Sequence, residues 1–417
     1  MSISWDELNN LEKEYGDSFY ILDLRKFENN YKDFLEGFRK IYPKANFGYS
    51  YKTNYVPLLC KSVNLMGGYA EVVSQMEYEL ALQIGVKPEK IIFNGPLKHQ
   101  NDLEKAIIKG SKINLDCQEE VEIVAALARR FPEHKIEVGI RCNFDIGASR
   151  ISRFGFDVEA GELDNIFRAF AELDNCSVAG LHCHLNTVTR SIDSYALRTQ
   201  KILELSDYYF QNSNPKFLDI GGGFFSSMAD DLRQQFDFHI PSYQEYATAI
   251  ASQFKERFLS SSNLELIPEL ILEPGVAVVA DVMKYVGKIV GLKTIRSRKI
   301  ALVVGSIHNV KPTMTDKKLS SKLYVNPNIS HQHKIKGPCD LVGYTCMEHD
   351  CLYKDYAEEV GIGDYLVFDN IGAYTIVFKP PFIRPNPPII SYDSAMNEYS
   401  LCRRKETSAD VFSTYVI

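Results

Sequence analysis

One lysine in the first part of the chain stands where it could act as a nucleophile. Lys52 lies in NFGYSYKTN, directly after the apolar run 45–49, which predicts a buried strand. A lysine at the end of a barrel strand points into the barrel mouth, where desolvation and nearby positive charge lower the pKa of an amine and make it nucleophilic toward a carbonyl. Taken alone, such a lysine is more often a solvated strand-end residue.

Two histidines follow another predicted strand. His182 and His184 flank Cys183 in GLHCHL, and the alternation of side chains along a strand places both rings on one face. The pair could bind a metal ion, stack on a planar cofactor or transfer protons. The structural alternative is a pair of satisfied core histidines.

Glycines and a carboxylate end two further apolar runs. Gly221, Gly222 and Gly223 in FLDIGGGFF would let backbone N–H groups approach a phosphate, although a tight turn would use the same residues. Glu273 in LILEPG needs a partner if its run is a buried strand. That partner could be a ring-nitrogen cation such as a pyridinium, or an internal arginine such as Arg141 in VGIRC.

A cysteine- and histidine-rich string, GYTCMEHDC, contains Cys346, His349, Asp350 and Cys351. The nearby side chains with metal-binding chemistry are His331, His333 and Cys339. Their spacing fits no common zinc pattern, so we expect no metal site. Cys346 could instead act as an acid or a nucleophile.

Short apolar runs alternate with amphipathic segments over the first two thirds of the chain. The runs that read as buried strands are 45–49, 69–73, 90–93, 112–115, 135–141, 178–184, 217–220 and 270–272. The helical segments are 26–41, 75–85, 100–109, 118–131, 158–173, 191–210 and 243–260. Eight strands alternating with helices predict an α/β fold, a (β/α)8 barrel, with a doubly wound sheet as the alternative.

The pattern changes after about residue 280, where β-rich strings follow one another and a short helix is expected only near 353–358. We therefore predict a barrel over 26–278 and a β-sandwich or β-barrel domain over 279–417, joined by the early strand 19–24. The proline-rich stretch 379–388 predicts a stiff loop.

The bulk composition narrows the classes of partner. The 417 residues carry a net charge of −7 without a basic stripe, which argues against nucleic acid or an anionic membrane as a partner. Nine scattered cysteines without a CxxC pair indicate reduced thiols, and the sequence shows neither a signal peptide nor an apolar run of membrane-spanning length. These features predict a cytoplasmic protein.

Taken in order, the motifs resemble those of the fold-type III pyridoxal-phosphate decarboxylases, which include diaminopimelate, ornithine and arginine decarboxylases and share an alanine-racemase-like barrel. The matching strings, spread from about 19 to 385, are YSYKTN, EVVSQMEYELALQIGV, LHCHL, LDIGGGF, EPG, GYTCMEHD and GDYLVFDNIGAYT. One such string would be a weak signal, whereas seven in the family's order are a strong one.

The resemblance implies a role for each matching residue. Lys52 would bond pyridoxal 5'-phosphate as a Schiff base, His184 would stack on the pyridine ring, and Glu273 would pair with the ring nitrogen. The other cofactor-binding positions that it implies are Glu71, Arg141, Thr187, Gly221, Gly222, Gly223, Gly275 and Tyr374. The ring would delocalise the carbanion left by CO2, and Cys346 or Lys52 would return a proton to the α-carbon. Cys346 and Asp350 would reach into a partner subunit's site, which implies a homodimer.

The sequence departs from the family at informative places. Val276 replaces the arginine of EPGR, which contacts phosphate in the family, so another cation, the glycine amides or Tyr374 must meet the phosphate charge. Asn186 replaces a glycine after the stacking histidine. The positions that the resemblance makes substrate-facing are His308, Asn309, Lys311, Met347, Glu348, Asp350 and Arg384.

These departures shape the predicted function. Two candidate acidic groups for a distal substrate amine are gone, so we predict a specialised amino-acid decarboxylase, for a secondary-metabolite or modified amino acid with a distal carboxylate or amide facing Lys311. The alternatives are a racemase or another Cα-chemistry enzyme on the same barrel, and a non-catalytic regulator that heterodimerises with a decarboxylase. Glu273 favours the decarboxylase, because racemases of this fold pair the ring nitrogen with arginine.

Overall fold

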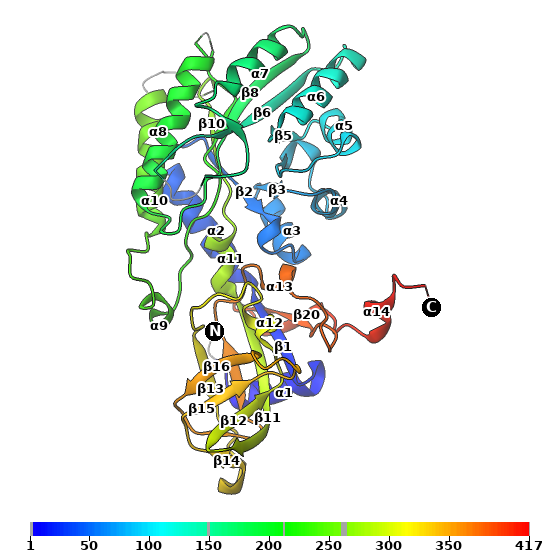
Figure 1. The fold of residues 1–417 in the computed structure, drawn as a ribbon, viewed down its shortest axis with the longest axis vertical. Coiled ribbons are helices and arrows are strands. Elements are labelled where there is room, and N and C mark those ends of the chain that lie inside the picture. Colours follow the sequence, from blue (N-terminus) through cyan, green and yellow to red (C-terminus); the bar gives the residue numbers. More distant parts are fainter. Residues whose placement is uncertain (1–2, 148–150, 212, 260–264, 417) are drawn as a thin grey trace. The chain divides into compact units, whose positions relative to one another are not determined.

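The computed structural model describes residues 3–147, 151–211, 213–259 and 265–416. The chain forms two compact units (Figure 1). The first, which we call the β unit, comprises 1–27, 226–237 and 278–417, and the second, the barrel unit, comprises 28–225 and 238–277.

Eight parallel strands form a closed barrel. They are β2 (Ala45–Ser50), β3 (Tyr69–Val72), β4 (Ile91–Phe93), β5 (Lys112–Leu115), β6 (Ile136–Asn143), β8 (Cys176–His182), β9 (Phe217–Asp219) and β10 (Glu269–Leu272). The pairing runs β5-β4-β3-β2-β10-β9-β8-β6, and a further β5–β6 pairing closes the ring. The predicted (β/α)8 barrel is therefore confirmed, and the doubly wound sheet is excluded. Because the strands are parallel, their carboxyl ends open at one mouth.

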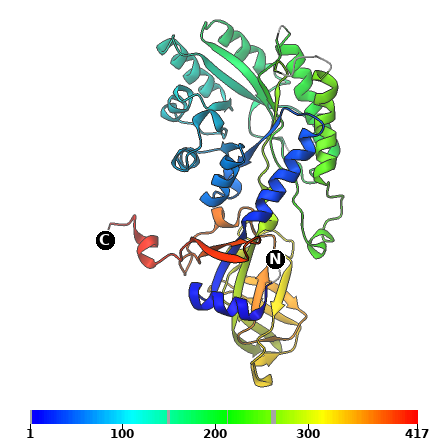
Figure 2. The same ribbon diagram turned by 180° about the vertical axis from the view of Figure 1, so that it is seen from behind.

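Helices surround the barrel on its outer side (Figure 2). They are α2 (Leu24–Arg39), α3 (Pro57–Leu65), α4 (Gln75–Gln83), α5 (Gln100–Ile108), α6 (Gln118–Arg130), α7 (Glu162–Ala171), α8 (Ile192–Tyr209) and α10 (Tyr243–Phe258). Serine side chains cap the amino ends of two long helices. Ser191 caps α8, and Ser242 caps α10. Short elements within this unit are β7 (Phe156–Asp157), η1 (Tyr51–Thr53) and η2 (Pro88–Lys90).

The barrel interior is a packed core. A cluster drawn from five strands joins Tyr69, Ile92, Ala179, Phe217 and Ile271, all of them buried. Packed side chains fill the interior of such barrels, so chemistry is confined to the mouth formed by the strand ends. The polar residues that follow the strands are therefore the ones placed to take part in chemistry.

The β unit is built around a nine-stranded sheet. Its strands are β1 (Ser18–Asp23), β11 (Met283–Ile295), β12 (Arg298–Val303), β13 (Ser321–Tyr324), β15 (Cys339–Val342), β16 (Cys351–Tyr356), β18 (Tyr365–Phe368), β19 (Ile389–Asp393) and β20 (Glu398–Arg403). β1 pairs with β11 antiparallel and with β19 parallel, so the early strand belongs to this sheet. Helix α1 (Trp5–Tyr15) contributes Leu8 and Leu11 to the core beside the sheet.

The shorter elements connect the strands of this unit. They are α9 (Asp230–Arg233), α11 (Val276–Val279, whose first two residues fall in the barrel unit), η3 (Ala280–Val282), α12 (Ile307–Val310), η4 (His331–His333), β14 (Lys334–Ile335), β17 (Val360–Gly361), α13 (Thr375–Phe378) and α14 (Ser408–Phe412).

The short helix expected near 353–358 is wrong, because the chain there forms strand β16. The buried residues Leu352 and Tyr356 are four positions apart, a spacing that suits one face of a helix and equally one face of a strand. Backbone pairing with β15 decides the outcome, and a register shift leaves Asp355 with a positive φ of 54°. The sequence pattern alone could not distinguish the two.

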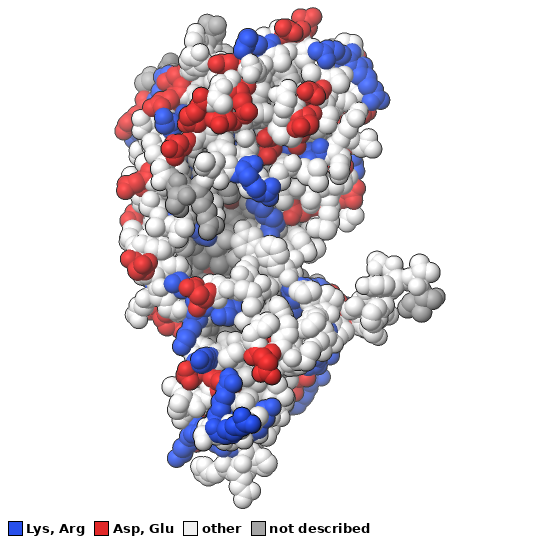
Figure 3. Space-filling model, viewed as in Figure 1, with Lys and Arg blue, Asp and Glu red and all other residues white. Residues whose placement is uncertain are grey.

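Charge is unevenly distributed on the face in Figure 3. Acidic and basic side chains are interspersed over the barrel unit, whereas Lys and Arg gather on part of the β unit. Among the described residues, no helix combines the length and the apolar character that a membrane crossing requires.

Candidate active site

Lys52 and Glu71 form an ion pair at the barrel mouth. Lys52 lies in the turn η1 that directly follows β2, and Glu71 lies in the neighbouring strand β3. The Lys52 Nζ is 2.5 Å from Glu71 Oε2, and the glutamate side chain is fully buried whereas the lysine is 31% exposed. The ammonium compensates the buried carboxylate while one side of the lysine remains accessible.

Asn94 links this ion pair to a second buried carboxylate. Its Nδ2 donates to Glu71 Oε1 at 3.0 Å and to Glu273 Oε1 at 2.5 Å. Asn114, on β5, orients the Asn94 amide by donating to its Oδ1 at 2.8 Å. One set of hydrogen bonds therefore connects residues on or after β2, β3, β4, β5 and β10.

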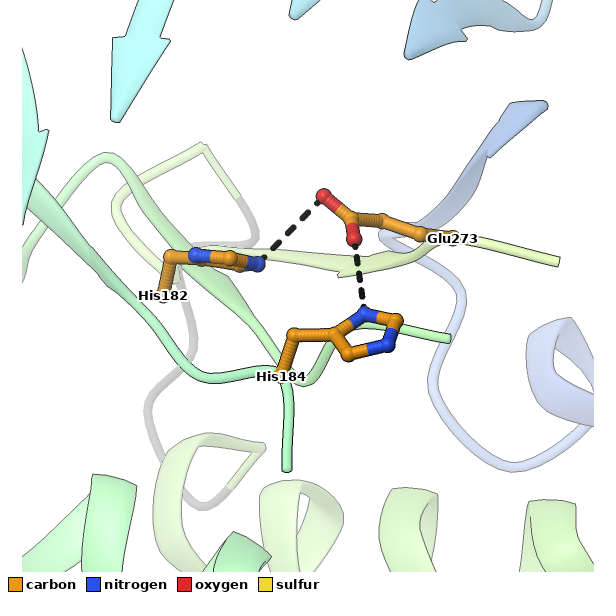
Figure 4. A group of neighbouring side chains, drawn as sticks. All are labelled: His182, His184 and Glu273. Carbon is orange, nitrogen blue, oxygen red and sulfur yellow. Dashed lines mark hydrogen bonds and ion pairs between the residues drawn. The ribbon is translucent and has the colours of Figure 1, made fainter. Parts of the chain in front are cut away.

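Glu273 lies between the two histidines (Figure 4). Its Oε1 is 3.5 Å from His182 Nε2, and its Oε2 is 3.4 Å from His184 Nδ1. Burial by itself would raise the pKa of Glu273, but the contacts with His182 and His184 and the charge of Lys52 hold it well below its usual range. Glu273 is therefore an anion at neutral pH.

The pKa of a third buried carboxyl group, Asp219, shifts in the opposite direction from that of Glu273. Its side chain is completely buried at the end of β9, and burial together with the charge of Glu273 raises its pKa well above the usual range. Its Oδ1 accepts the Gly221 N–H at 2.8 Å, and Oδ2 has no partner among the described residues. Two neighbouring carboxyl groups thus differ in charge because of their surroundings.

His184 is held as a neutral ring. The Gly222 N–H donates to its Nδ1 at 3.1 Å, and the same nitrogen lies 3.4 Å from Glu273 Oε2. Burial lowers the pKa of His184 to about 4, against the opposing attraction of Glu273.

The same geometry bears on the metal alternative. His182, His184 and Glu273 offer ligand atoms within 4.8 Å of one another, which makes them the one group of metal-ligand type found in the described part of the chain. The lone pair on His184 Nδ1 already accepts the Gly222 N–H, so a metal bound there would have to displace that hydrogen bond. This hydrogen bond therefore disfavours a metal ion at that nitrogen.

The glycines let neighbouring loops approach each other closely. A Cβ on Gly221 would lie 2.4 Å from the Cys183 carbonyl oxygen, and one on Gly222 would lie 2.2 Å from that of Glu273. A Cβ on Gly275 would be 2.1 Å from a threonine hydroxyl of the β2 turn. Side chains are sterically excluded at all three positions, which leaves the backbone itself lining this part of the mouth.

Arg141 and Thr187 complete the barrel positions that the sequence singled out. Arg141 Nη1 pairs with Asp116 at 3.1 Å, and Nη2 donates to the His184 carbonyl oxygen at 3.1 Å. Glu273 is therefore not the partner of Arg141, which removes the internal-arginine alternative. Thr187 Oγ1 lies 3.4 Å from the Ser194 hydroxyl.

A match to a family model identifies the protein family to which this chain belongs. Residues 24–280 match the model described as the pyridoxal-binding domain of pyridoxal-dependent decarboxylases. The chain belongs to this decarboxylase family. Its cofactor is pyridoxal phosphate, and the predicted family, enzyme class and cofactor are confirmed.

Individual relatives extend over nearly the whole length of this decarboxylase. It is 25% identical over 413 residues to diaminopimelate decarboxylase of Aquifex aeolicus, covering 96% of this chain and 91% of the relative. It is also 25% identical to an L-glutamyl-(acyl-carrier protein) decarboxylase of Niallia circulans, covering 99% and 97%. The crystal structure of diaminopimelate decarboxylase from M. jannaschii in complex with L-lysine superimposes with a TM-score of 0.83 at 22% identity, covering 98% and 94%.

In the β unit of the decarboxylase, several substrate-facing candidates are occupied by local hydrogen bonds. Asp350 is buried, its Oδ1 accepts the Ile307 N–H at 2.7 Å, and its Oδ2 accepts the N–H and the hydroxyl of Thr345 at 3.0 and 2.6 Å. Asn309 is also buried, and its Oδ1 accepts the Ser306 N–H at 2.9 Å in a capping box.

The other candidates in this unit differ in exposure. Cys346 and Glu348 are exposed and Met347 is half-buried. His308 is half-buried with its ring 6.2 Å from that of Phe382.

Two cations and a strained tyrosine complete the set. The Lys311 Nζ donates to the Thr315 carbonyl oxygen at 3.2 Å, and Arg384 is 3.7 Å from Asp17. Tyr374 has a positive φ of 64°, a conformation that a bulky residue rarely adopts outside strained functional segments.

Four polar residues of the mouth were missed from sequence: Asn94, Asn114, Asp116 and Asp219. Each lies within or directly after a buried strand, a position that could have drawn attention. Asparagine and aspartate are also ordinary turn residues, so the sequence alone gave no reason to select them.

Proposed function

We propose that this decarboxylase removes CO2 from an amino acid whose far end carries a carboxylate, an amide or a carrier linkage rather than a free amine. The observation that carries the catalytic part is the hydrogen-bonded set from Lys52 through Glu71 and Asn94 to Glu273. Together with His184 beside Glu273, it supplies an amine, an ionised carboxylate and a neutral imidazole at one barrel mouth.

The residues present fit pyridoxal phosphate. Lys52 would hold its carbonyl carbon, His184 would cover one ring face, and the amides of the glycine segment would bind its phosphate. Asp219 Oδ2 and His182 Nδ1 are buried without a hydrogen-bond partner among the described residues, and His182 Nε2 faces Glu273 Oε1 at 3.5 Å. Such a buried polar cluster suits a polar, charged guest.

The cofactor supplies an electron sink for the charge that departing CO2 leaves on the α-carbon. Glu273, held as an anion, would stabilise a proton on the ring nitrogen of the cofactor. Glu71 holds the Lys52 ammonium at 2.5 Å, ready to move a proton at Nζ. Cys346, which is exposed in the single chain, is the second candidate proton donor.

The substrate proposal rests on the departures in the β unit. Met347 stands where a carboxylate would be suited to a distal amine, and the local hydrogen bonds of Asp350 leave it no free oxygen. Lys311 offers a cation instead. The relative named for a glutamyl group on an acyl-carrier protein is matched over 99% of this chain. Its substrate illustrates the chemical class that we propose.

A screen of CO2 release tests this proposal. Purified holoenzyme is offered L- and D-amino acids, glutamate amides and a glutamyl thioester of an acyl-carrier protein, beside meso-diaminopimelate and ornithine. We expect the fastest release from a substrate without a free distal amine. Fastest release from meso-diaminopimelate or ornithine would overturn the substrate class while leaving the decarboxylase assignment intact.

We also propose that the enzyme is a cytoplasmic homodimer whose Cys346 and Asp350 loop completes the partner's site, with Asp350 shaping that loop. All nine cysteines are free thiols, in keeping with a reducing compartment. Mixing inactive Lys52→Ala and Cys346→Ala subunits tests the dimer. One intact site in each mixed dimer should restore activity, whereas mixtures as inactive as the parents would refute a shared site.

A further inference from the structure

A buried arginine without a counter-ion lies beside the glycine segment of the barrel. Arg198, on α8, is 1% exposed, and no carboxylate of a described residue lies within ion-pair distance of it. Its Nη2 donates to the Leu185 carbonyl oxygen at 2.7 Å and its Nε to that of Ser194 at 3.4 Å. Its Nη1 is buried and has no hydrogen-bond partner among the described residues. An unpaired buried charge is costly unless a charge of opposite sign is supplied.

Arg198 is connected to the glycines by one intervening side chain. Its guanidinium lies 4.0 Å from the ring centroid of Tyr195, whose hydroxyl donates to the Gly222 carbonyl oxygen at 2.9 Å. A Cβ on Gly223 would lie 3.2 Å from the same hydroxyl. Tyr195 therefore separates the arginine from the segment whose amides would bind phosphate.

A second arginine approaches the same segment from the loop before α8. The guanidinium of Arg190 lies 4.5 Å over the ring of Phe225, two positions after Gly223. The backbone of Arg190 is left-handed, with φ 47°, and Tyr246 donates to its carbonyl oxygen at 2.9 Å. No ion pair of Arg190 with a described carboxylate is found. The loop is thus held in a strained conformation that carries a cation toward Phe225.

The remainder of the mouth offers little positive charge for a phosphate. Lys52 is engaged by Glu71 and Arg141 by Asp116. The loop after β10 continues from Gly275 to an uncharged valine, Val276. A phosphate dianion on the glycine amides would lack a cation there, whereas the two unpaired arginines lack an anion.

We propose that Arg198 and Arg190 are positioning residues that supply the positive charge for the cofactor phosphate in this chain. Arg198 acts through Tyr195 and the glycine segment, and Arg190 acts from the loop after β8. A bound phosphate would supply the anion that the buried guanidinium lacks, and the guanidinium would supply the cation that the phosphate lacks. This inference rests on the family's cofactor and is independent of the substrate.

The test compares pyridoxal phosphate with pyridoxal, which lacks the phosphate. Apoenzyme prepared from holoenzyme is titrated with each, and the dissociation constants are taken from the change in absorbance. For Arg198→Met we expect pyridoxal phosphate to bind about 30-fold more weakly, whereas pyridoxal should change by less than about twofold. Arg198→Lys should recover part of the affinity. The matched control is Arg257→Gln, an exposed arginine on α10 paired with Asp207, which should leave both constants unchanged.

Two outcomes would overturn the proposal. Equal weakening of both ligands would show that Arg198 only supports the fold, and unchanged affinity for pyridoxal phosphate would show that its charge is not used.

If Arg198→Met does not fold, Arg190→Gln keeps the proposal open to refutation, because this side chain lies outside the core. Its expected effect is about fivefold weaker binding of pyridoxal phosphate alone, together with a smaller rise in apoenzyme melting temperature on adding inorganic phosphate. A phosphate-induced rise equal to that of the parent, with equal affinity for pyridoxal phosphate, would refute it.

Discussion

The barrel mouth and the loops of the β unit use buried carboxylates in different ways. At the mouth, Glu71 and Glu273 contact side chains from several strands, and each faces a group that can carry or exchange a proton. In the β unit, the Asp350 carboxylate accepts hydrogen bonds from Ile307, at the start of α12, and from Thr345 in its own loop. The carboxylates of the mouth hold reactive groups in fixed charge states, whereas Asp350 holds the backbone of the β-unit loops in place. We therefore propose that the residues of the mouth determine the type of reaction and that the β-unit loops determine the choice of substrate.

The largest effect is expected from removing the amine. Lys52→Ala should lower kcat by about four orders of magnitude, because it removes the side chain that we propose holds the cofactor and moves protons. The visible absorbance of the holoenzyme should disappear with it. Lys61→Ala, on the barrel helix α3, is the control and should retain both colour and rate. A yellow, active Lys52→Ala enzyme would contradict the role given to the mouth.

The next effect tests the charge of the buried carboxylate. Glu273→Gln keeps the shape but removes the anion between His182 and His184, so we expect kcat to fall about 100-fold with little change in KM. Spectra and single-turnover rates would report the loss. A variant as fast as the parent would show that the ionised state is not used.

The barrel strands were predictable because a buried parallel strand is a short apolar run bounded by turn residues, as at Ile91–Phe93. Lys52, His184 and Glu273 were recognisable because they follow such runs. Asn94 was not, because its importance comes from Glu71 and Glu273, which are separated from it by 23 and 179 positions. Arg198 looks like any polar residue of an amphipathic helix, and only the packing around it reveals a buried charge.

The neutral state of His184 at the barrel mouth can be tested through the pH dependence of apoenzyme stability. Burial lowers the pKa of His184 from 6.5 to about 4, so the unfolded chain binds more protons than the folded one between these values. The stability contributed by neutral His184 is therefore complete above pH 6.5 and is lost as pH falls toward 4, by about 3 kcal/mol. Urea unfolding of the parent and of His184→Asn, each between pH 7 and pH 4, measures this change in the free energy of unfolding. Parallel curves would contradict a neutral ring.

A smaller change is expected in the β unit. Asp350→Asn places an NH2 group against N–H donors, so we expect unfolding to cost about 1–3 kcal/mol less, with the cofactor absorbance unchanged. The exposed neighbour Glu348→Gln is the control and should have little effect. Intact stability combined with a large rise in KM would instead place Asp350 on the substrate.

The smallest effect should distinguish the two regions most directly. Lys311 donates to the Thr315 carbonyl oxygen, a contact weak enough to be exchanged for a substrate anion. Lys311→Met should therefore raise KM about tenfold for substrates with a distal carboxylate and leave kcat nearly unchanged, because a binding contact is lost without touching the reacting atoms. Lys318→Met, an exposed lysine of the same unit, is the control. A fall in kcat at constant KM would move Lys311 from substrate choice to the chemistry and would remove the division of labour between the two regions.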